Sequence, residues 1–225
     1  MLIDILIASG LAWPLNVDTS QKKDRSMQVQ FVFDYRSPYS YLANARLTEL
    51  EHGVEYLPVD VLAVMKKVNN QPSPACPVKA KYAMEDAARW AKVYDVPLKP
   101  NMDLFKALRT ADVDGSLFSR AGLAALKTGV FEAFHTGLFH AVWAGEDDLV
   151  SVEGRSAFLK KLGLDVDVWS VADTADIREQ IEAHNESSAH RGVFGVPSFV
   201  CADELFFGND RLNFVIAKLN AAKEA

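Results

Sequence analysis

The feature that most constrains the fold is a buried strand that runs directly into a helix near the start of the chain. Residues 28–34 (QVQFVFD) alternate at first and then become continuously apolar, which is typical of a strand buried on both faces. Ser37 and Pro38 then open a helix, because serine is a good N-cap and proline is tolerated at the first helical position. The stretch therefore predicts a strand whose end meets a helix N-terminus.

The order of the remaining elements predicts the fold class. They are a helix to about Glu51, a strand at 54–59, helices over about 61–191, strands at 198–201 and 205–207 around a turn at 202–204, and a last helix from Asn209. Strand–helix–strand, a long helical insert and then hairpin–helix is the order of a thioredoxin fold with a helical subdomain in mid-chain. We predict an α/β, thioredoxin-like fold in which an all-helical subdomain, about 61–191, separates an N-terminal βαβ half from a C-terminal ββα half.

The first 26 residues differ in composition from the domain that follows. Residues 1–15 are apolar, and the residues after them are polar and turn-rich. A secretory signal needs a positive start and an unbroken apolar stretch, whereas no Lys or Arg precedes this one and Asp4 interrupts it. Two other interpretations are a start assigned too early, with Met27 as the true first residue, and a short helix that docks on the domain. We assign 1–26 to an extension and 27–225 to the folded domain.

Composition excludes several classes of protein. The 225 residues carry 24 Lys and Arg against 30 Asp and Glu, whereas a nucleic-acid binder would show a basic domain or stripe. No uncharged apolar run approaches the ~20 residues that a membrane span needs. Cys76 and Cys201 lie far apart and form no CxxC pair, which argues against a disulfide scaffold and a dithiol redox centre. The five histidines show no metal-ligand spacing. We expect a soluble cytoplasmic protein without a metal.

The first of three clusters with candidate chemistry lies at the strand-to-helix junction. A helix N-terminus presents free backbone N–H groups and partial positive charge, which stabilise a thiolate held there. Redox members of this fold have a cysteine at the place of Ser37, and Ser37 and Ser40 stand where the paired cysteines would be. A serine cannot exchange disulfides, but it can donate a hydrogen bond to the thiolate of another molecule. The alternative is that Ser37 is merely an N-cap, and the two roles are compatible.

The second cluster is a proline just before the strand at 198–201. In thioredoxin-like proteins this proline follows a cis bond that faces the N-terminus of the first helix, although only ~5% of X–Pro bonds are cis overall. Val196, which precedes Pro197, could then offer its backbone N–H and C=O to an extended peptide. The alternative is an ordinary edge-strand proline.

The third cluster opens the last helix at Asn209 and Asp210. Either residue is a natural N-cap, which is the alternative to a binding role. In a binding role the helix N-terminus holds a carboxylate while Asp210 pairs with an ammonium group, and a γ-glutamyl group carries both. Taken together, the clusters predict a glutathione site in which Ser37 meets the thiol, Val196 and Pro197 the cysteinyl backbone, and Asn209 and Asp210 the γ-glutamyl end.

With these motifs the chain resembles the 2-hydroxychromene-2-carboxylate isomerases, bacterial relatives of kappa-class glutathione transferases in the DsbA-like thioredoxin group. The matching stretches are FDYRSPYSYLA (33–43), Asn70-Gln71-Pro72 with Lys79 beyond it, VFGVPSF (193–199) and FFGNDRL (206–212). The resemblance runs from about Met27 to the C-terminus. The matching stretches are specific as a set, although no one of them is specific alone. It implies that Ser37 meets the glutathione sulfur, that Asn70 and Lys79 help to hold the tripeptide, Lys79 through its glycine carboxylate, and that the protein is a homodimer.

The resemblance also implies a reaction. It is the reversible isomerisation of 2-hydroxychromene-2-carboxylate to trans-o-hydroxybenzylidenepyruvate, so the expected partners are glutathione and a small aromatic carboxylate. Glutathione thiolate would add to the conjugated carbonyl of a ring-opened form, a bond would rotate, and elimination would restore the thiolate. The alternatives are a kappa-like glutathione transferase, which consumes glutathione, and a non-catalytic thioredoxin-like module that binds a partner chain.

The helical insert is expected to decide the substrate. Arg109 could meet a substrate carboxylate, although a solvated or salt-bridged arginine is the more common case. Cys76 could be a free thiol near the site or a cysteine without a role. Four aromatic residues could line a pocket or belong to the core: Tyr82, Trp90, Phe105 and Phe118.

Overall fold

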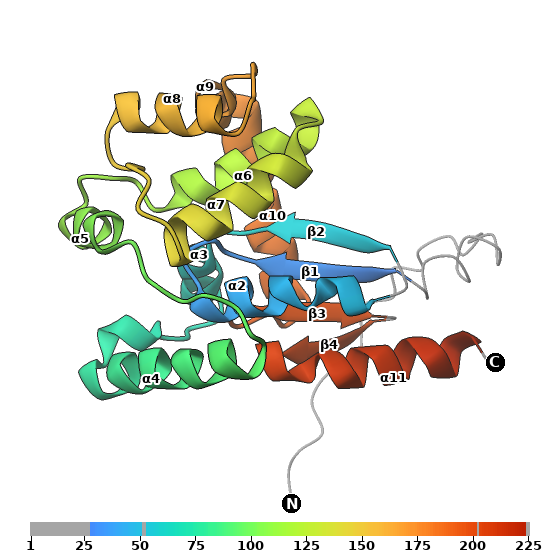
Figure 1. Ribbon diagram of the computed structural model, residues 1–225. Coiled ribbons are helices and arrows are strands. Elements are labelled where there is room, and N and C mark those ends of the chain that lie inside the picture. The colour runs from blue at the N-terminus through green and yellow to red at the C-terminus, as the bar shows by residue number, and fades with distance from the viewer. Residues whose placement is uncertain (1–27, 51–52, 202, 224–225) are drawn as a thin grey trace, which may run out of the picture.

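A four-stranded mixed sheet forms the centre of the molecule. The computed structural model describes residues 28–50, 53–201 and 203–223 (Figure 1). The strands are β1 (Val29–Phe33), β2 (Val54–Pro58), β3 (Ser198–Cys201) and β4 (Glu204–Phe207), in the order β2-β1-β3-β4. β1 pairs with β2 in parallel and with β3 antiparallel, and β3 and β4 form the hairpin. The prediction of a thioredoxin-like α/β fold is confirmed; the extension 1–26 lies outside the described residues.

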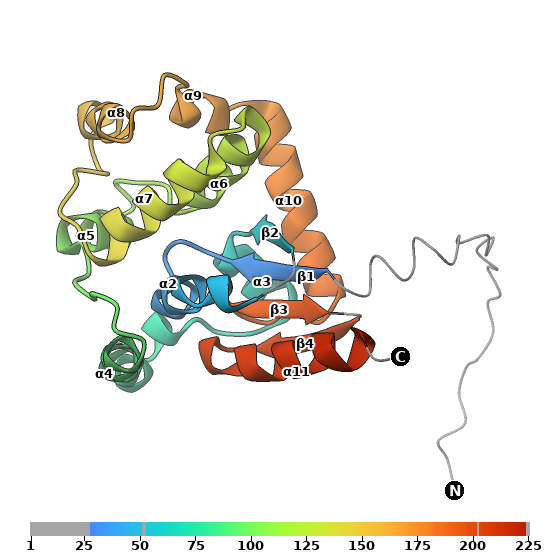
Figure 2. The same ribbon diagram turned by 45° about the vertical axis from the view of Figure 1, so that its right-hand side comes forward.

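Helices cover the sheet and build a layer beside it. They are α2 (Pro38–Ala45), α3 (Val61–Lys67), α4 (Pro77–Val93), α5 (Met102–Thr110), α6 (Ser116–Thr128), α7 (Phe131–Trp143), α8 (Val152–Lys161), α9 (Val168–Ala172), α10 (Ala175–His190) and α11 (Leu212–Lys223). Helices α6 to α9 form the layer above the sheet in Figures 1 and 2, and α10 runs from that layer back to the sheet. Among the described residues, none of these helices is both long and apolar enough to cross a membrane.

The alternation of apolar side chains along the strands builds two cores. Phe31 and Phe199 belong to the larger core, together with residues of α2, α7 and α11. Val32 and Val200 point to the opposite face, where Val64 of α3 completes a smaller core. The first helix of the predicted insert, α3, therefore covers the sheet itself.

The helix after β1 is shorter than predicted. We expected it to reach about Glu51, which lies outside the described residues, but α2 ends at Ala45 and a 3-10 turn follows over Leu47–Glu49. A 3-10 turn brings side chains three positions apart onto one face. Leu47 and Leu50 are both buried, so the tighter turn directs both into the core.

The last helix also starts differently from the prediction. A 3-10 turn over Asn209–Arg211 follows Gly208, and the regular helix α11 begins only at Leu212. Gly208 has a φ of +120°, a conformation that side-chain-bearing residues rarely adopt, and its N–H donates to the carbonyl of Pro197 at 3.0 Å. The bend thus attaches the start of this segment to the proline loop.

Candidate functional site

Ser37 caps the N-terminus of α2. Its Oγ accepts a hydrogen bond from the backbone N–H of Ser40 at 3.2 Å, and its own N–H donates to the carbonyl of Asp34 at 3.0 Å. The capping role predicted as the alternative is therefore present. Ser37 is half-buried, whereas Ser40 is buried, so Ser37 is the hydroxyl of the two that a ligand can reach.

The proline loop faces this helix end. The Val196–Pro197 peptide bond is cis, and the Ser37 hydroxyl donates to the carbonyl of Val196 at 3.3 Å. The loop is closed on itself by Ser198, whose hydroxyl donates to the carbonyl of Gly195 at 2.9 Å. The predicted meeting of a cis-proline loop with the first helix terminus is thus confirmed across 159 positions of sequence.

The third predicted cluster lies beside the loop, but its two side chains differ in availability. Asn209 is buried and its amide donates to the hydroxyl of Tyr94 at 3.2 Å, while that hydroxyl donates to the Asn209 carbonyl at 3.3 Å. The Asn209 side chain is therefore engaged inside the protein. Asp210 is only partly buried and pairs with its neighbour Arg211 at 2.7 Å, a contact that a ligand can replace.

Asn70 and Lys79, the two residues that the family resemblance adds to the site, lie in different environments. Asn70 supports the proline loop, because its amide donates to the carbonyl of Phe194 at 2.7 Å and its Oδ1 accepts from the N–H of Gln71 at 2.8 Å. Lys79 is exposed on the first turn of α4, and none of the ion pairs between described residues includes it. The structure therefore brings Asn70 to the loop and leaves Lys79 in solvent.

A buried charge network next to Ser37 is not predicted by the sequence patterns. The guanidinium of Arg36 donates from Nε to Asp34 at 2.9 Å and from Nη2 to Asp60 at 2.6 Å. Burial lowers the pKa of Arg36, but the carboxylates, chiefly Asp34, outweigh this effect and raise the pKa above its usual range. Asp34 is completely buried at the end of β1. A charge at the end of a buried strand requires a partner, and that signal could have revealed the network.

A second unpredicted network fixes the other end of α2. His135 of α7 lies 2.8 Å from the hydroxyl of Tyr35 through Nδ1 and 2.8 Å from Oδ1 of Asn44 through Nε2. Because an amide oxygen only accepts, Nε2 carries the proton and Nδ1 accepts from Tyr35. Burial lowers the pKa of His135 to about 3, so the imidazole stays neutral. No spacing in the sequence indicates a contact between residues 100 positions apart.

The candidate substrate residues of the insert are spread over different environments. Phe118 is completely buried and belongs to the core, and Trp90 and Phe105 pack against it. Tyr82 and Arg109 are exposed. Cys76 is half-buried immediately before α4. In the part of the chain that the structure describes, no three His, Cys, Asp or Glu residues gather to hold a metal ion.

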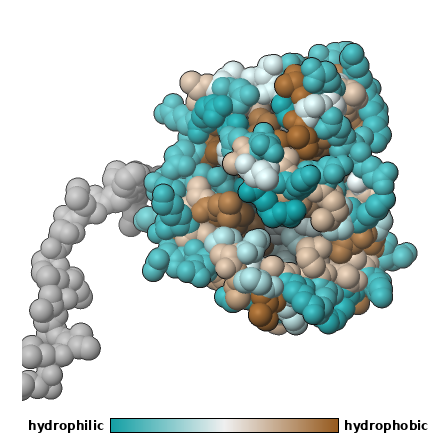
Figure 3. All heavy atoms as spheres, turned by 90° about the vertical axis from the view of Figure 1, so that its left-hand side faces the viewer, coloured by the Kyte–Doolittle hydropathy of each residue, from teal (hydrophilic) through white to brown (hydrophobic). Residues whose placement is uncertain are grey.

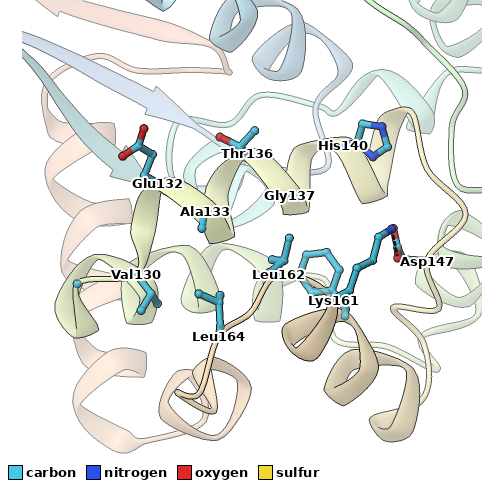
Figure 4. Close-up of a pocket in the computed structure, with 12 residues that line it drawn as sticks. Val130, Glu132, Ala133, Thr136, Gly137, His140, Asp147, Lys161, Leu162 and Leu164 are labelled. Atoms are coloured by element: carbon cyan, nitrogen blue, oxygen red, sulfur yellow. Dashed lines mark hydrogen bonds and ion pairs between the residues drawn. The ribbon is translucent and has the colours of Figure 1, made fainter.

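The surface has two hollowed features. The face that carries α4 and α5 is hollowed between its upper and lower parts (Figure 3). A separate groove of about 840 Å³ lies between α7 and α8, and its polar end is formed by His140 and the ion pair of Lys161 with Asp147 at 2.7 Å (Figure 4). None of the predicted site residues lines this groove.

Comparison with known proteins places the chain among its relatives. Residues 28–220 match the family described as "DSBA-like thioredoxin domain". Two curated relatives named 2-hydroxychromene-2-carboxylate isomerase are 35% identical (Sphingobium xenophagum; 83% of this chain, 95% of the relative) and 33% identical (Pseudomonas putida; 83% and 91%). Glutathione S-transferase kappa 1 of Caenorhabditis elegans is 36% identical over 91 residues, which cover 37% of this chain and 40% of the relative.

Solved structures show the same fold. A structure of 2-hydroxychromene-2-carboxylate isomerase is 27% identical, covers 87% of this chain and 95% of that chain, and has a TM-score of 0.69. A probable DsbA oxidoreductase from Streptomyces coelicolor is 19% identical with a TM-score of 0.63, covers 88% of this chain and 90% of that chain, and supports the fold alone.

Proposed function

We propose a function from the premise that this chain belongs to the DsbA-like thioredoxin family and, within it, to the 2-hydroxychromene-2-carboxylate isomerases. The protein is a glutathione-dependent isomerase that interconverts 2-hydroxychromene-2-carboxylate and trans-o-hydroxybenzylidenepyruvate, or a related aromatic compound. One observation carries the proposal: a serine hydroxyl stands at the N-terminus of α2, 3.3 Å from the carbonyl of the cis-proline loop. That is where a redox relative would need a reactive cysteine.

The atoms around Ser37 fit a thiol ligand. The single proton of the Ser37 hydroxyl is held by the Val196 carbonyl at 3.3 Å, a long hydrogen bond that is easily exchanged. When the Ser37 hydroxyl donates its proton to a bound thiolate instead, the Val196 carbonyl becomes free to accept the cysteinyl N–H of glutathione. The positive end of α2 adds to the stabilisation of the anion. A ligand with both a thiol and a peptide N–H therefore matches this pair of groups.

The ends of the tripeptide would be held by residues on either side of this pair. The Asp210 carboxylate would exchange Arg211 for the γ-glutamyl ammonium, and the N–H groups of the 3-10 turn would meet the γ-glutamyl carboxylate. The glycine carboxylate would reach Lys79. Asn70 and the Asn209 side chain act indirectly in this arrangement, because the first supports the proline loop and the second is bonded to Tyr94.

The chemistry follows from these positions. Bound glutathione would supply a thiolate that adds reversibly to the conjugated carbonyl of the ring-opened substrate and leaves after the intervening bond has rotated. Ser37 and the α2 terminus would keep that thiolate deprotonated near neutral pH. The proline loop would hold the cysteinyl backbone in one orientation, so that the sulfur always approaches the substrate from the same side.

The test is turnover with and without glutathione, combined with measurement of the thiol that remains. We expect the full chain to isomerise the substrate only when glutathione is present, and the glutathione to be recovered unchanged. Loss of one thiol per product molecule would instead identify a transferase, the second candidate, which is favoured by the 36% identity to a kappa transferase over 91 residues. Equal turnover without glutathione would contradict the glutathione dependence that both candidates share. No turnover together with no glutathione binding would contradict both candidates and favour a thioredoxin-like binding module.

A further inference from the structure

The groove between α7 and α8 has an apolar floor that the described part of the chain leaves open. Val130, Ala133 and Gly137 lie on the α7 side, and Leu162 and Leu164, which follow α8, lie opposite. Figure 4 shows these residues around one space, with polar side chains at its rim and at one end. An apolar hollow bounded by polar residues is typical of a contact site.

The walls of this groove are held in place by the core. On the opposite face of α7, Phe134 and Leu138 are completely buried. Phe158 of α8 lines the groove and meets the ring of Phe134 edge-on. Leu162 packs so closely on α7 that a Cβ at Gly137 would lie 2.6 Å from it. The hollow is therefore preformed, and a segment that binds in it does not have to open it.

The N-terminal extension contains an apolar run to which the proposed function gives no role. The match to the family begins only at residue 28. Residues 2–7 (LIDILI) carry five Leu and Ile side chains around Asp4, and the stretch from 16 to 26 is mostly polar. Because burial of aliphatic side chains away from water is favourable, such a run is stabilised by an apolar surface within its reach.

The described chain begins close to one end of the groove. Val29, at the start of β1, pairs with Val54 of β2. Further along β2, the ring of Tyr56 lies 4.8 Å from the ring of Phe131, which directly follows the groove residue Val130. A chain extends by up to ~3.3 Å per residue, so the polar stretch before β1 is longer than α7. The apolar run can therefore reach any part of the groove.

We propose that residues 2–7 dock in the groove between α7 and α8 of their own chain. Their aliphatic side chains match the apolar floor, and Asp4 lies at the polar rim. Because the extension is tethered to the domain, its effective concentration at the groove favours this contact over the same contact with a second copy. The inference is independent of the proposed function, since no residue of the proposed glutathione site lines the groove.

The test is hydrogen exchange of the full chain, read by mass spectrometry after the intact mass has shown that the extension is present. We expect the amides of residues 2–7 to exchange roughly tenfold more slowly than in an unstructured peptide of the same sequence. Ala133→Glu places a charge at an exposed position of the groove and should abolish this protection. Ala157→Glu, at an exposed position of α8 outside the groove, is the matched control and should keep it.

A second pair of variants changes only the extension and so leaves the folded domain intact. Leu6→Asp should remove the protection of residues 2–7, whereas Ser9→Asp, which adds the same charge beyond the run, should keep it. A docked segment stabilises the folded state. Thermal unfolding of Leu6→Asp should therefore occur at a lower temperature than that of Ser9→Asp and of the wild type.

Four results would overturn the proposal. Exchange of residues 2–7 at the unstructured rate in the wild type would show that nothing covers them. Protection that persists in Ala133→Glu would place the run elsewhere on the protein. Protection that increases with protein concentration would assign the contact to a second copy. An intact mass that lacks the apolar run in protein isolated from its source would identify the run as a segment that is removed or never made.

Discussion

The two ends of helix α2 are built in opposite ways. At the C-terminal end, Asn44, His135 and Tyr35 form two hydrogen bonds of 2.8 Å each, and His135 is only 3% exposed. At the N-terminal end, the half-buried Ser37 has bonds of 3.2 and 3.3 Å to backbone groups. One end is thus fully bonded inside the core, and the other keeps long bonds that a ligand can replace. The comparison indicates that α2 is anchored at its far end so that its near end stays available for binding.

The largest expected effect is the loss of folding stability in acid that His135, at the C-terminal end of α2, causes. Because burial lowers the pKa of His135 to about 3 in the folded protein, the unfolded chain binds this proton more readily. The contribution of His135 to stability is complete above the ordinary pKa of about 6.5 and is lost as the pH falls toward 3, by about 1.4 kcal/mol per pH unit. We expect urea unfolding at pH 7, 6 and 5 to show about half of this slope between pH 7 and 6 and nearly all of it between pH 6 and 5.

A pair of variants isolates the histidine responsible. His135→Gln should unfold at lower urea concentration at pH 7 but lose the additional slope below pH 6. His190→Gln, at an exposed histidine on the last turn of α10, should keep the wild-type slope. An identical slope in His135→Gln and the wild type would show that the anchored end does not contribute in this way.

At the available end, Ser37→Ala should have the largest effect on activity. Loss of a charge-assisted hydrogen bond to the thiolate costs about 1.5–3 kcal/mol, so kcat/KM should fall roughly tenfold to a hundredfold. Stability should decrease by only ~1 kcal/mol through loss of the N-cap. Ser151→Ala removes a similar cap from α8, where Oγ accepts from the N–H of Gly154 at 2.9 Å, and should leave kcat/KM unchanged. Equal losses in the two variants would assign Ser37 to capping alone.

A smaller effect is expected at Asp210. Because its carboxylate would pair with the γ-glutamyl ammonium in a partly exposed position, Asp210→Asn should raise the Kd for glutathione about fivefold. The rate at saturating glutathione should stay near the wild-type value. Asp203→Asn, in the turn of the β3–β4 hairpin, makes the same change at an exposed position away from Ser37. A Kd that is equal in both variants would exclude Asp210 from the site.

The smallest effect is expected at Lys79. An exposed ion pair is worth about 1 kcal/mol or less, so Lys79→Met should weaken glutathione binding only about threefold. Its control is Lys81→Met on the same helix, where the side chain is 80% exposed and lies 3.9 Å from Glu85. If both changes have the same effect, Lys79 acts only through the general charge of α4.

The sequence predicted the elements that depend on local pattern and left out the contacts that depend on tertiary packing. The strand at 29–33, the cap at Ser37 and the hairpin after Pro197 follow from alternation and turn chemistry, and each is present. The 3-10 turn at Asn209 was missed because the same residues also favour a helix start. The contact of His135 with Tyr35 and the close packing of Arg36 against Gly115 join distant segments, and no periodicity encodes them.

The central claim is that Ser37 and the α2 terminus hold glutathione as a thiolate, and calorimetry in two buffers of different ionisation enthalpy tests it most directly. A thiol with a pKa near 8.5 is mostly protonated at pH 7, so binding as a thiolate releases close to one proton, which appears as a buffer-dependent heat. We expect release of nearly one proton per bound glutathione in the wild type and clearly less in Ser37→Ala. A heat that is independent of the buffer, or the same release in both proteins, would contradict the account.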